Sequence, residues 1–154
     1  MQQKQSEAQA REEFFNKMER RFADKILTVE MVCIEADRET FALLKLKPTQ
    51  KHALLWGLLI IGEKDLHFYA HPTESAFLGL FRNASNGKPP EEQSFSFRVF
   101  KERRLGLVEK RTLFGKRYDP YRLVLNARMD DGGSVSFYLH THNKADSILE
   151  KCRP

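Results

Sequence analysis

The segment from Leu54 to His71 constrains the fold of this chain more than any other stretch. Residues 54–61 are apolar apart from Gly57, residues 62–65 form a polar run, and the residues that follow alternate between apolar and polar side chains. This pattern predicts a β-hairpin. A strand with one solvated face would alternate, and the first strand does not, so we expect both of its faces to be covered.

The N-terminal segment supplies a candidate for the second cover. Residues 6–23 are rich in helix formers and predict one amphipathic helix. Its apolar stripe consists of Phe14, Phe15, Met18 and Phe22. We expect the helix to pack on its own domain, and a partner protein is the alternative. The chain is therefore divided into a helical extension, residues 1–24, and a β domain, residues 25–154.

Alternating patterns predict the remaining strands. The predicted strands span residues 25–36, 41–47, 94–100, 105–114, 121–129 and 134–140, with turns at 116–120 and 130–133. Gly57 predicts a bulge or bend inside its strand. Asn143 is expected to cap a final helix that carries one apolar stripe. The predicted fold class is mainly β, with seven or eight antiparallel strands and a helix at each end.

The hairpin also resembles a known family. From Gly57 to Phe68 its pattern is similar to the hairpin of GRAM and bacterial pleckstrin-homology-like (PH-like) domains. The matching positions are Gly57, Leu59, Ile61, Leu66 and Phe68. The Asp-Gly-Gly turn at 131–133, followed by a strand and a helix, resembles the end of such domains. The resemblance covers about residues 25–152 and implies a PH-like antiparallel β-barrel with a C-terminal capping helix. It implies binding of phosphoinositides, peptides or proteins.

Positive charge is concentrated in one part of the chain. The net charge is +5, which permits an anionic partner without requiring one. Residues 98–122 hold nine basic and three acidic side chains. We expect turns at 101–104 and 116–117 to converge on a headgroup or a phosphate backbone, and a solvated edge that resists aggregation is the alternative. The candidate anion-binding residues are Lys101, Arg103, Arg104, Lys110, Arg111, Lys116 and Arg117.

A second candidate surface is apolar. Residues 76–81 stand beside Arg82 and a Pro- and Gly-containing segment, which suggests contact with a partner or a membrane. The alternative is that they plug one end of the barrel. The candidate residues are Phe77, Leu78, Leu80 and Phe81.

The sequence gives little support for a catalytic site or a metal site. His67 with His71 and His140 with His142 could supply four imidazoles to zinc, but the sequence does not bring the pairs together, so we expect exposed histidines and no metal. No nucleophile motif or phosphate-binding glycine loop is present. Cys33 and Cys152 are expected to be core thiols. We predict a non-enzymatic chain without a cofactor or transmembrane segment, in a reducing, cytoplasmic setting.

The predicted role is that of a binding or adaptor module. A protein partner is favoured, bound through an exposed strand edge or residues 72–93. The first alternative is a peripheral membrane module that contacts anionic lipid through residues 98–122. Against it, the turn at 36–40 lacks the basic pattern of phosphoinositide-binding PH domains. The third reading is a small nucleic-acid-binding barrel that uses the same arginines with Tyr118 and Tyr121.

Overall fold

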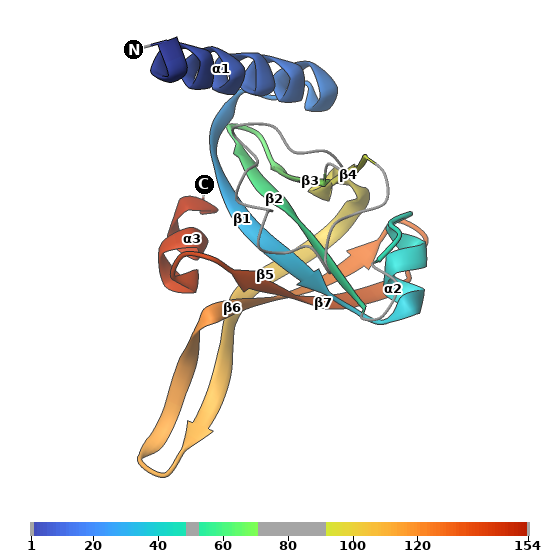
Figure 1. The fold of residues 1–154 in the computed structure, drawn as a ribbon. Helices are drawn as coiled ribbons and strands as arrows, with labels where there is room; N and C mark the ends of the chain where they lie inside the picture. The colour runs from blue at the N-terminus through green and yellow to red at the C-terminus, as the bar shows by residue number, and fades with distance from the viewer. Residues whose placement is uncertain (1, 49–52, 71–91, 154) are drawn as a thin grey trace.

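A computed structural model describes residues 2–48, 53–70 and 92–153 of the chain (Figure 1). Seven strands form one antiparallel sheet in the order β4-β3-β2-β1-β7-β6-β5. The predicted mainly β fold class with an N-terminal and a C-terminal helix is therefore confirmed. In chain order the elements are α1 (Gln2–Phe22), β1 (Ile26–Glu35), α2 (Arg38–Leu43), β2 (Leu54–Gly62), β3 (Leu66–Ala70), β4 (Gln93–Ser96), the 3-10 helix η2 (Phe97–Val99), β5 (Phe100–Thr112), β6 (Gly115–Met129), β7 (Ser134–Thr141) and α3 (Ala145–Lys151).

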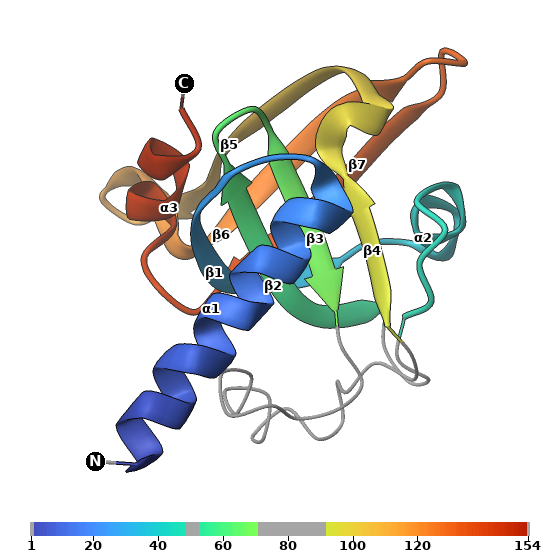
Figure 2. The same ribbon diagram turned by 90° about the horizontal axis from the view of Figure 1, so that it is seen from above.

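Two meanders build the sheet. Strands β1 to β4 follow one another, strands β5 to β7 follow one another, and the pairing of β1 with β7 joins the two sets. The sheet curls into a half-barrel whose open side lies between its end strands, β4 and β5 (Figures 1 and 2). The helix α3 packs against β5 and β6, and α2 lies beside β7. Both helices therefore help to close the inner core of the curled sheet.

Aromatic rings fill the position where β4 gives way to β5. The predicted strand over residues 94–100 ends at Ser96, and η2 carries the chain to β5. The ring centroids of Phe95 and Phe97 are 5.3 Å apart, and those of Phe97 and Phe100 are 5.5 Å apart. These buried rings occupy the seam where the sheet has no backbone pairing.

The prediction that both faces of β2 are covered is confirmed, and α1 covers the second face. On the inner face, Leu55 and Leu59 belong to the main core. On the outer face, Leu58 and Ile60 pack in a second cluster with Met18 and Phe22 of α1. Figure 2 shows α1 crossing this side of the sheet. The second apolar layer explains why β2 does not alternate.

Gly57 does not mark a bulge, which is one of the two features predicted for this position. The β1–β2 register is regular there, with Val32 opposite Gly57. A Cβ atom on Gly57 would lie 2.4 Å from Cζ of Phe68 and 2.7 Å from the backbone oxygen of Tyr69. The glycine is therefore required because an aromatic ring packs directly on the strand.

The predicted strand at 41–47 is wrong, because this part of the chain contains the helix α2. The Asp37 side chain accepts a hydrogen bond of 2.7 Å from the Thr40 backbone nitrogen and so caps the helix. Phe41 and Leu44 reach the main core from the helix and its C-terminal cap. The segment's apolar residues satisfy a helical period as well as an alternating one.

The C-terminal helix is confirmed, but its predicted cap is wrong. The helix α3 begins at Ala145, and the capping residue Lys144 makes no side-chain hydrogen bond there. The Asn143 amide instead donates to the buried carboxylate of Glu30 at 2.8 Å. Lys151 donates to the same carboxylate at 2.7 Å. Both contacts tie the ends of α3 to β1.

Candidate binding surface

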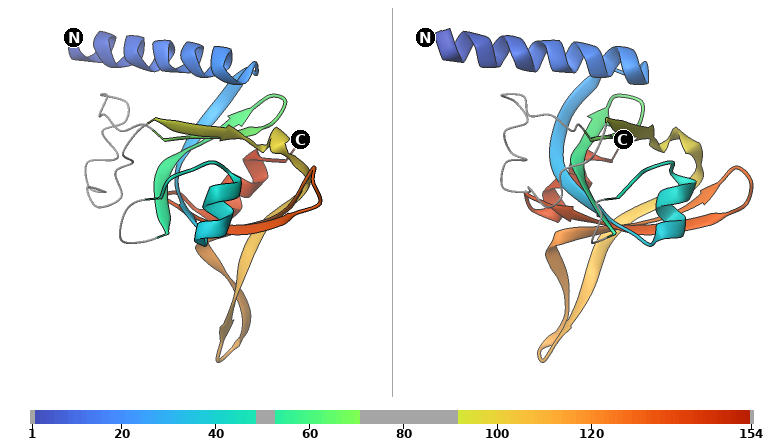
Figure 3. Two further views of the ribbon diagram at one scale, coloured as in Figure 1. Left: turned by 90° about the vertical axis from the view of Figure 1, so that its right-hand side faces the viewer. Right: turned by 45° about the vertical axis from the view of Figure 1, so that its right-hand side comes forward.

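A β-hairpin arm projects from the half-barrel. The last core rung joins Leu107 of β5 to Leu123 of β6, and beyond a register shift the two strands continue as a free ribbon. Figures 1 and 3 show this ribbon leaving the body on the side opposite α1. We call residues 108–121 the arm. Most of its side chains are exposed, and Val108 and Asp119 are half-buried.

The apex of the arm presents two apolar side chains to solvent. Leu113 is 100% exposed and Phe114 is 90% exposed. The Thr112 hydroxyl donates to the Gly115 carbonyl at 2.8 Å, and the Phe114 backbone nitrogen donates to that hydroxyl at 3.3 Å. Gly115 has φ +119°, a conformation that L side chains rarely adopt. The local sequence therefore builds a tight turn that holds both apolar side chains outward.

The predicted turn at 116–120 is wrong, since these residues belong to β6 and the turn lies at Leu113 and Phe114. Alternation assigned both residues to a strand, and they were missed as candidate contacts. A sequence signal was available, because residues 110–117 read Lys-Arg-Thr-Leu-Phe-Gly-Lys-Arg. Two basic pairs that flank a short apolar turn with glycine are symmetric about a hairpin apex.

Four of the predicted anion-binding residues are brought together directly behind this apex. Lys110 lies opposite Arg117, and Arg111 lies opposite Lys116. Residues directly opposite in an antiparallel pair share a face of the ribbon, and successive residues take opposite faces. One cationic pair therefore lies on each face. In the described part of the chain, none of the four makes an ion pair. We call these four residues the basic collar.

The other three predicted residues lie elsewhere. Lys101, Arg103 and Arg104 are in the part of β5 that belongs to the body. The spacing from residue 104 to residue 110 along β5 corresponds to roughly 20 Å at about 3.3 Å per residue. Residues 116–117 lie opposite residues 110–111, so they are at least as far from residues 101–104. The expected convergence of 101–104 with 116–117 is therefore wrong. The apolar candidates Phe77, Leu78, Leu80 and Phe81, and most of the 72–93 segment, lie outside the described residues.

Arg103 has a structural role. Its guanidinium bonds Asp65 at 2.6 Å and the Phe97 carbonyl at 3.4 Å, and lies over the Phe97 ring. Asp65 precedes β3, so the contact bridges the two ends of the curled sheet. This cation is already engaged by the fold, which removes it from the free basic surface.

A buried polar cluster joins α1 to the sheet. The Asp24 carboxylate accepts hydrogen bonds from the backbone nitrogens of Lys64 and Asp65 at 2.9 and 3.0 Å. It also accepts one from His67 Nε2 at 2.9 Å, while His67 Nδ1 lies 2.9 Å from the Ser96 hydroxyl. The expectation of exposed strand-face histidines is thus wrong for His67, which is fully buried.

Burial and hydrogen bonding set the ionisation of this cluster. Burial lowers the pKa of His67 below 6.5, against the opposing effect of the Asp24 carboxylate. Burial would raise the pKa of Asp24, yet hydrogen bonds from His67 and the Lys64 and Asp65 backbone bring it below 3.8. A neutral His67 that donates from Nε2 to Asp24 and accepts at Nδ1 from Ser96 satisfies all three groups.

The cluster resembles a Ser-His-Asp triad in composition, but it has neither an accessible imidazole nor a free serine hydroxyl. The Phe22 ring stacks on His67 at a centroid distance of 4.4 Å. The Ser96 hydroxyl also accepts a hydrogen bond from the Arg98 backbone nitrogen, as the cap of η2. The imidazole is therefore closed off from solvent and the hydroxyl is occupied, which fits a structural network better than a nucleophile.

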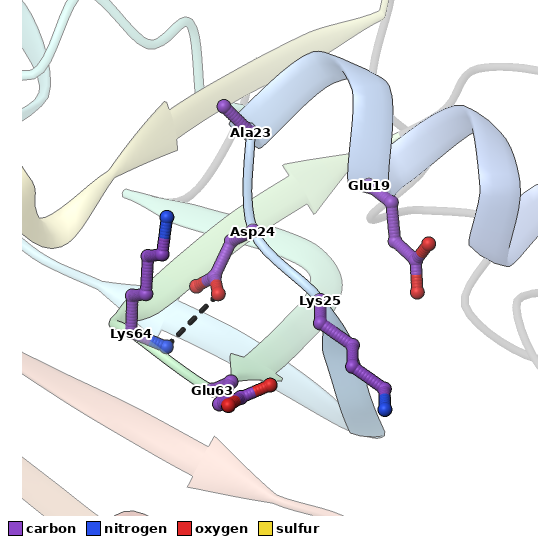
Figure 4. A pocket seen from close by; sticks show the side chains of 6 residues that line it. All are labelled: Glu19, Ala23, Asp24, Lys25, Glu63 and Lys64. Carbon is purple, nitrogen blue, oxygen red and sulfur yellow. Dashed lines mark hydrogen bonds between the residues drawn. The ribbon is translucent and has the colours of Figure 1, made fainter.

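The hollow beside this cluster has few features of a ligand site (Figure 4). It has a volume of about 450 Å³ and is lined by Glu19, Ala23, Asp24, Lys25, Glu63 and Lys64. Figure 4 shows the Asp24 carboxylate turned towards the Lys64 backbone nitrogen. Ala23 is the one apolar lining residue, whereas small-molecule sites are mostly apolar.

The described residues contain no assembled site for metal binding or for thiol chemistry. They contain no group of three or more His, Cys, Asp or Glu side chains that could hold a metal ion. His140 Nε2 bonds Glu35 at 2.6 Å. Burial raises the pKa of the Cys33 and Cys152 thiols to about 12 and about 11, so both are poor nucleophiles near neutral pH.

Of the helices described, none has the length and apolar character needed to cross a bilayer. No family model, curated protein or solved structure matches this chain.

Proposed function

We propose that this chain is a non-enzymatic binding module whose arm contacts an anionic macromolecular surface. The observation that carries the proposal is the apex, where two fully or almost fully exposed apolar side chains stand in front of the basic collar. Burial of Leu or Phe side chains is normally favourable. An arm that keeps both in water, away from the core, is suited to burying them against a partner.

The pairing of charges in the collar supports an anionic partner. Like charges directly opposite each other destabilise an antiparallel pair, and this ribbon has two such pairs in succession. A solvated edge that only resists aggregation would be served equally well by alternating signs. An anionic surface would relieve the repulsion, because each cation gains a partner that the described chain does not supply.

A protein partner is the second candidate, supported by a different feature. Strand β5 lies at the end of the sheet, so one edge of this 13-residue strand has no strand paired to it among the described residues. An extended segment of another protein could add to that edge. The β5 side chains include five Lys or Arg residues against two Glu, which favours an acidic segment.

The family and the setting are proposed on separate grounds. Two meanders followed by a C-terminal helix support membership of the PH-like barrels, as the hairpin pattern suggests. The free thiols Cys33 and Cys152 support a reducing, cytoplasmic setting. The adaptor role is proposed from the arm together with the β5 edge at residues 100–107, because that part of the edge lies in the body and is separate from the arm.

A shortened arm tests the proposal. Glu109 and Tyr118 are opposite each other, so residues 110–117 can be replaced by Asn-Gly, which closes a two-residue hairpin. We expect the intact chain to be retained on immobilised heparin and released by salt, and the shortened chain to elute at much lower salt. The arm lies outside the core, so the free energy of unfolding should change by less than about 1 kcal/mol.

A matched control separates the arm from net charge. The double variant Lys101→Glu with Arg104→Glu changes the net charge as much as the shortened arm does, but in the body of β5. We expect it to elute much closer to the intact chain. Equal losses in the two variants, or no retention of the intact chain on any polyanion, would contradict the proposal.

A further inference from the structure

The order of side chains along the arm matches the order of layers at a membrane surface. We propose that the anionic surface is a lipid bilayer, into which the arm inserts its apex end-on. This inference rests on the proposed function and adds the class of partner. Leu113 and Phe114 would enter the boundary of the acyl chains, while the basic collar would lie among the lipid phosphates.

The spacing between apex and collar fits that arrangement. At about 3.3 Å per residue, the Arg111–Lys116 pair lies about 7 Å behind the apex and the Lys110–Arg117 pair about 10 Å behind it. Apolar groups of interfacial elements are buried about 5–10 Å into the boundary between headgroups and acyl chains. Both cationic pairs therefore reach the phosphate level when the apex is immersed.

The two-sided collar favours insertion over one-sided contact. Lys110 and Arg117 lie on one face of the ribbon, and Arg111 and Lys116 lie on the other. Headgroups surround an inserted ribbon and can pair with both faces. A groove-lining or surface-tracking ribbon would place its cations on the face towards the phosphates, as nucleic-acid-binding surfaces do.

The position of the arm leaves room for a flat surface. It projects from the side of the body opposite α1, and both views of Figure 3 show it extending beyond the other elements on that side. Its apex can therefore touch a plane first. Tyr118, which is 58% exposed, follows directly behind the collar, at a level where amphipathic rings are enriched in membrane proteins.

Vesicle binding of the full chain tests the inference. The probes are phosphatidylcholine vesicles with and without phosphatidylserine, assayed by flotation at several salt concentrations. We expect binding to vesicles with phosphatidylserine only, weakening with salt. The double variant Leu113→Ser with Phe114→Ser should bind these vesicles at least about tenfold more weakly, yet keep its retention on heparin.

The control for the apex removes apolar side chains elsewhere. Leu27 and Leu43 are 57% and 45% exposed and lie outside the arm. The double variant Leu27→Ser with Leu43→Ser should bind vesicles within about twofold of the intact chain. An equal loss in both double variants would overturn the inference, because the effect would then not belong to the apex.

The collar has a test of its own. Reversing Lys110 and Arg117 to Glu, or reversing Arg111 and Lys116 to Glu, changes the charge of one face at a time. End-on insertion predicts that the two reversals weaken vesicle binding by similar factors, each about tenfold or more. If one face carries nearly all of the effect, the contact is one-sided and the inference is overturned.

Insertion depth can be read from fluorescence. Trp56 is the only tryptophan and packs with the cluster under α1, so it reports on the body. In the Phe114→Trp variant, vesicles with brominated acyl chains should quench the new tryptophan and leave Trp56 emission unchanged. Absence of quenching in bound protein would exclude insertion.

The outcomes separate the two proposals. Arm-dependent binding to heparin or to double-stranded DNA, without binding to phosphatidylserine vesicles, would leave the proposed function standing and overturn the bilayer inference. Binding to none of these anionic surfaces would overturn both.

Discussion

Asp24 is the buried charge that joins α1 to the sheet. It sits between the end of α1 and the start of β1, and its carboxylate accepts hydrogen bonds from the β2–β3 turn and from His67. The Arg98 guanidinium donates to the Phe22 carbonyl at 2.6 Å beside it. The buried carboxylate of Asp24 is tolerated because its three donors, the backbone nitrogens of Lys64 and Asp65 and Nε2 of His67, compensate for lost hydration.

This cluster predicts that acid destabilises the fold. The folded pKa of His67 lies below 6.5, so the unfolded chain binds more protons and the free energy of unfolding falls as the pH falls below about 6.5. The folded pKa of Asp24 lies below 3.8, which has the same sign and acts below about pH 4. Urea denaturation between pH 7.5 and about pH 5 should show this loss.

Two histidine variants give the control. His67→Gln removes the titrating group, and we expect its urea midpoint to be lower at neutral pH and to vary less between pH 7.5 and about pH 5. His142 is exposed, and His142→Gln should keep the pH dependence of the intact chain. Identical pH profiles for the intact chain and His67→Gln would contradict the assignment.

The helix α1 acts as a second layer of the molecule. Its buried residues Met18 and Phe22 pack with Leu58, Ile60 and Tyr69 of the sheet. Without this helix, the outer face of β2 and β3 would be a large exposed apolar surface. The part of the extension from Phe14 to Phe22 is thus part of the packed structure.

Truncation of one side chain tests this layer. Met18 has no exposed surface, and Met18→Ala should lower the free energy of unfolding by about 2–4 kcal/mol through lost burial and a residual cavity. Asn16 is exposed on the same helix, and Asn16→Ala should be nearly neutral. Similar urea midpoints for the two variants would mean that α1 is not docked in solution.

Unlike α1, the arm is an element that does not pack against the rest of the described structure. Its ribbon has no core behind it, and it depends on backbone pairing and the turn at Thr112–Gly115. It nevertheless continues strands that are anchored in the core at Leu107 and Leu123. A contact element built in this way can be long and exposed while its base is held rigidly.

At the scale of the whole molecule, the half-barrel has to be closed without backbone pairing between β4 and β5. The Phe95, Phe97 and Phe100 rings fill the seam, and the Arg103–Asp65 ion pair spans it. The two side chains are 32% and 16% exposed, so solvent screens part of the attraction. The pair still joins segments that are distant in sequence.

The ion pair predicts a difference between neighbouring arginines. Arg103→Ala should lower the free energy of unfolding by about 1 kcal/mol, because it removes the ion pair and the contact with Phe97. Arg104 is exposed, and Arg104→Ala should change it by less than about 0.5 kcal/mol. Urea denaturation of both variants is the measurement, and equal effects would argue against a role in the seam.

Local patterns predicted much of the fold. The hairpin predicted from Leu54, which the structure describes as far as Ala70, follows from periodicity, as do the strand at 25–36 and both terminal helices. Periodicity reports the face that each side chain takes. The requirement for a cover on the outer face of β2 followed from the same reasoning. The prediction of a strand at 41–47 is wrong because the apolar residues fit both a helical and an alternating period. The Asp37 cap favours the helix.

Contacts between distant segments could not be predicted in this way. Asp24 and His67 are 43 residues apart, and nothing in either segment signals the hydrogen bond between them. Alternation over residues 105–129 is the same whether a core lies behind the strands or not, so the arm and its apex became visible only when the sheet was assembled. The sequence by itself determines which face of its element each side chain takes. The closure of the curled sheet determines which side chains meet and which remain in water.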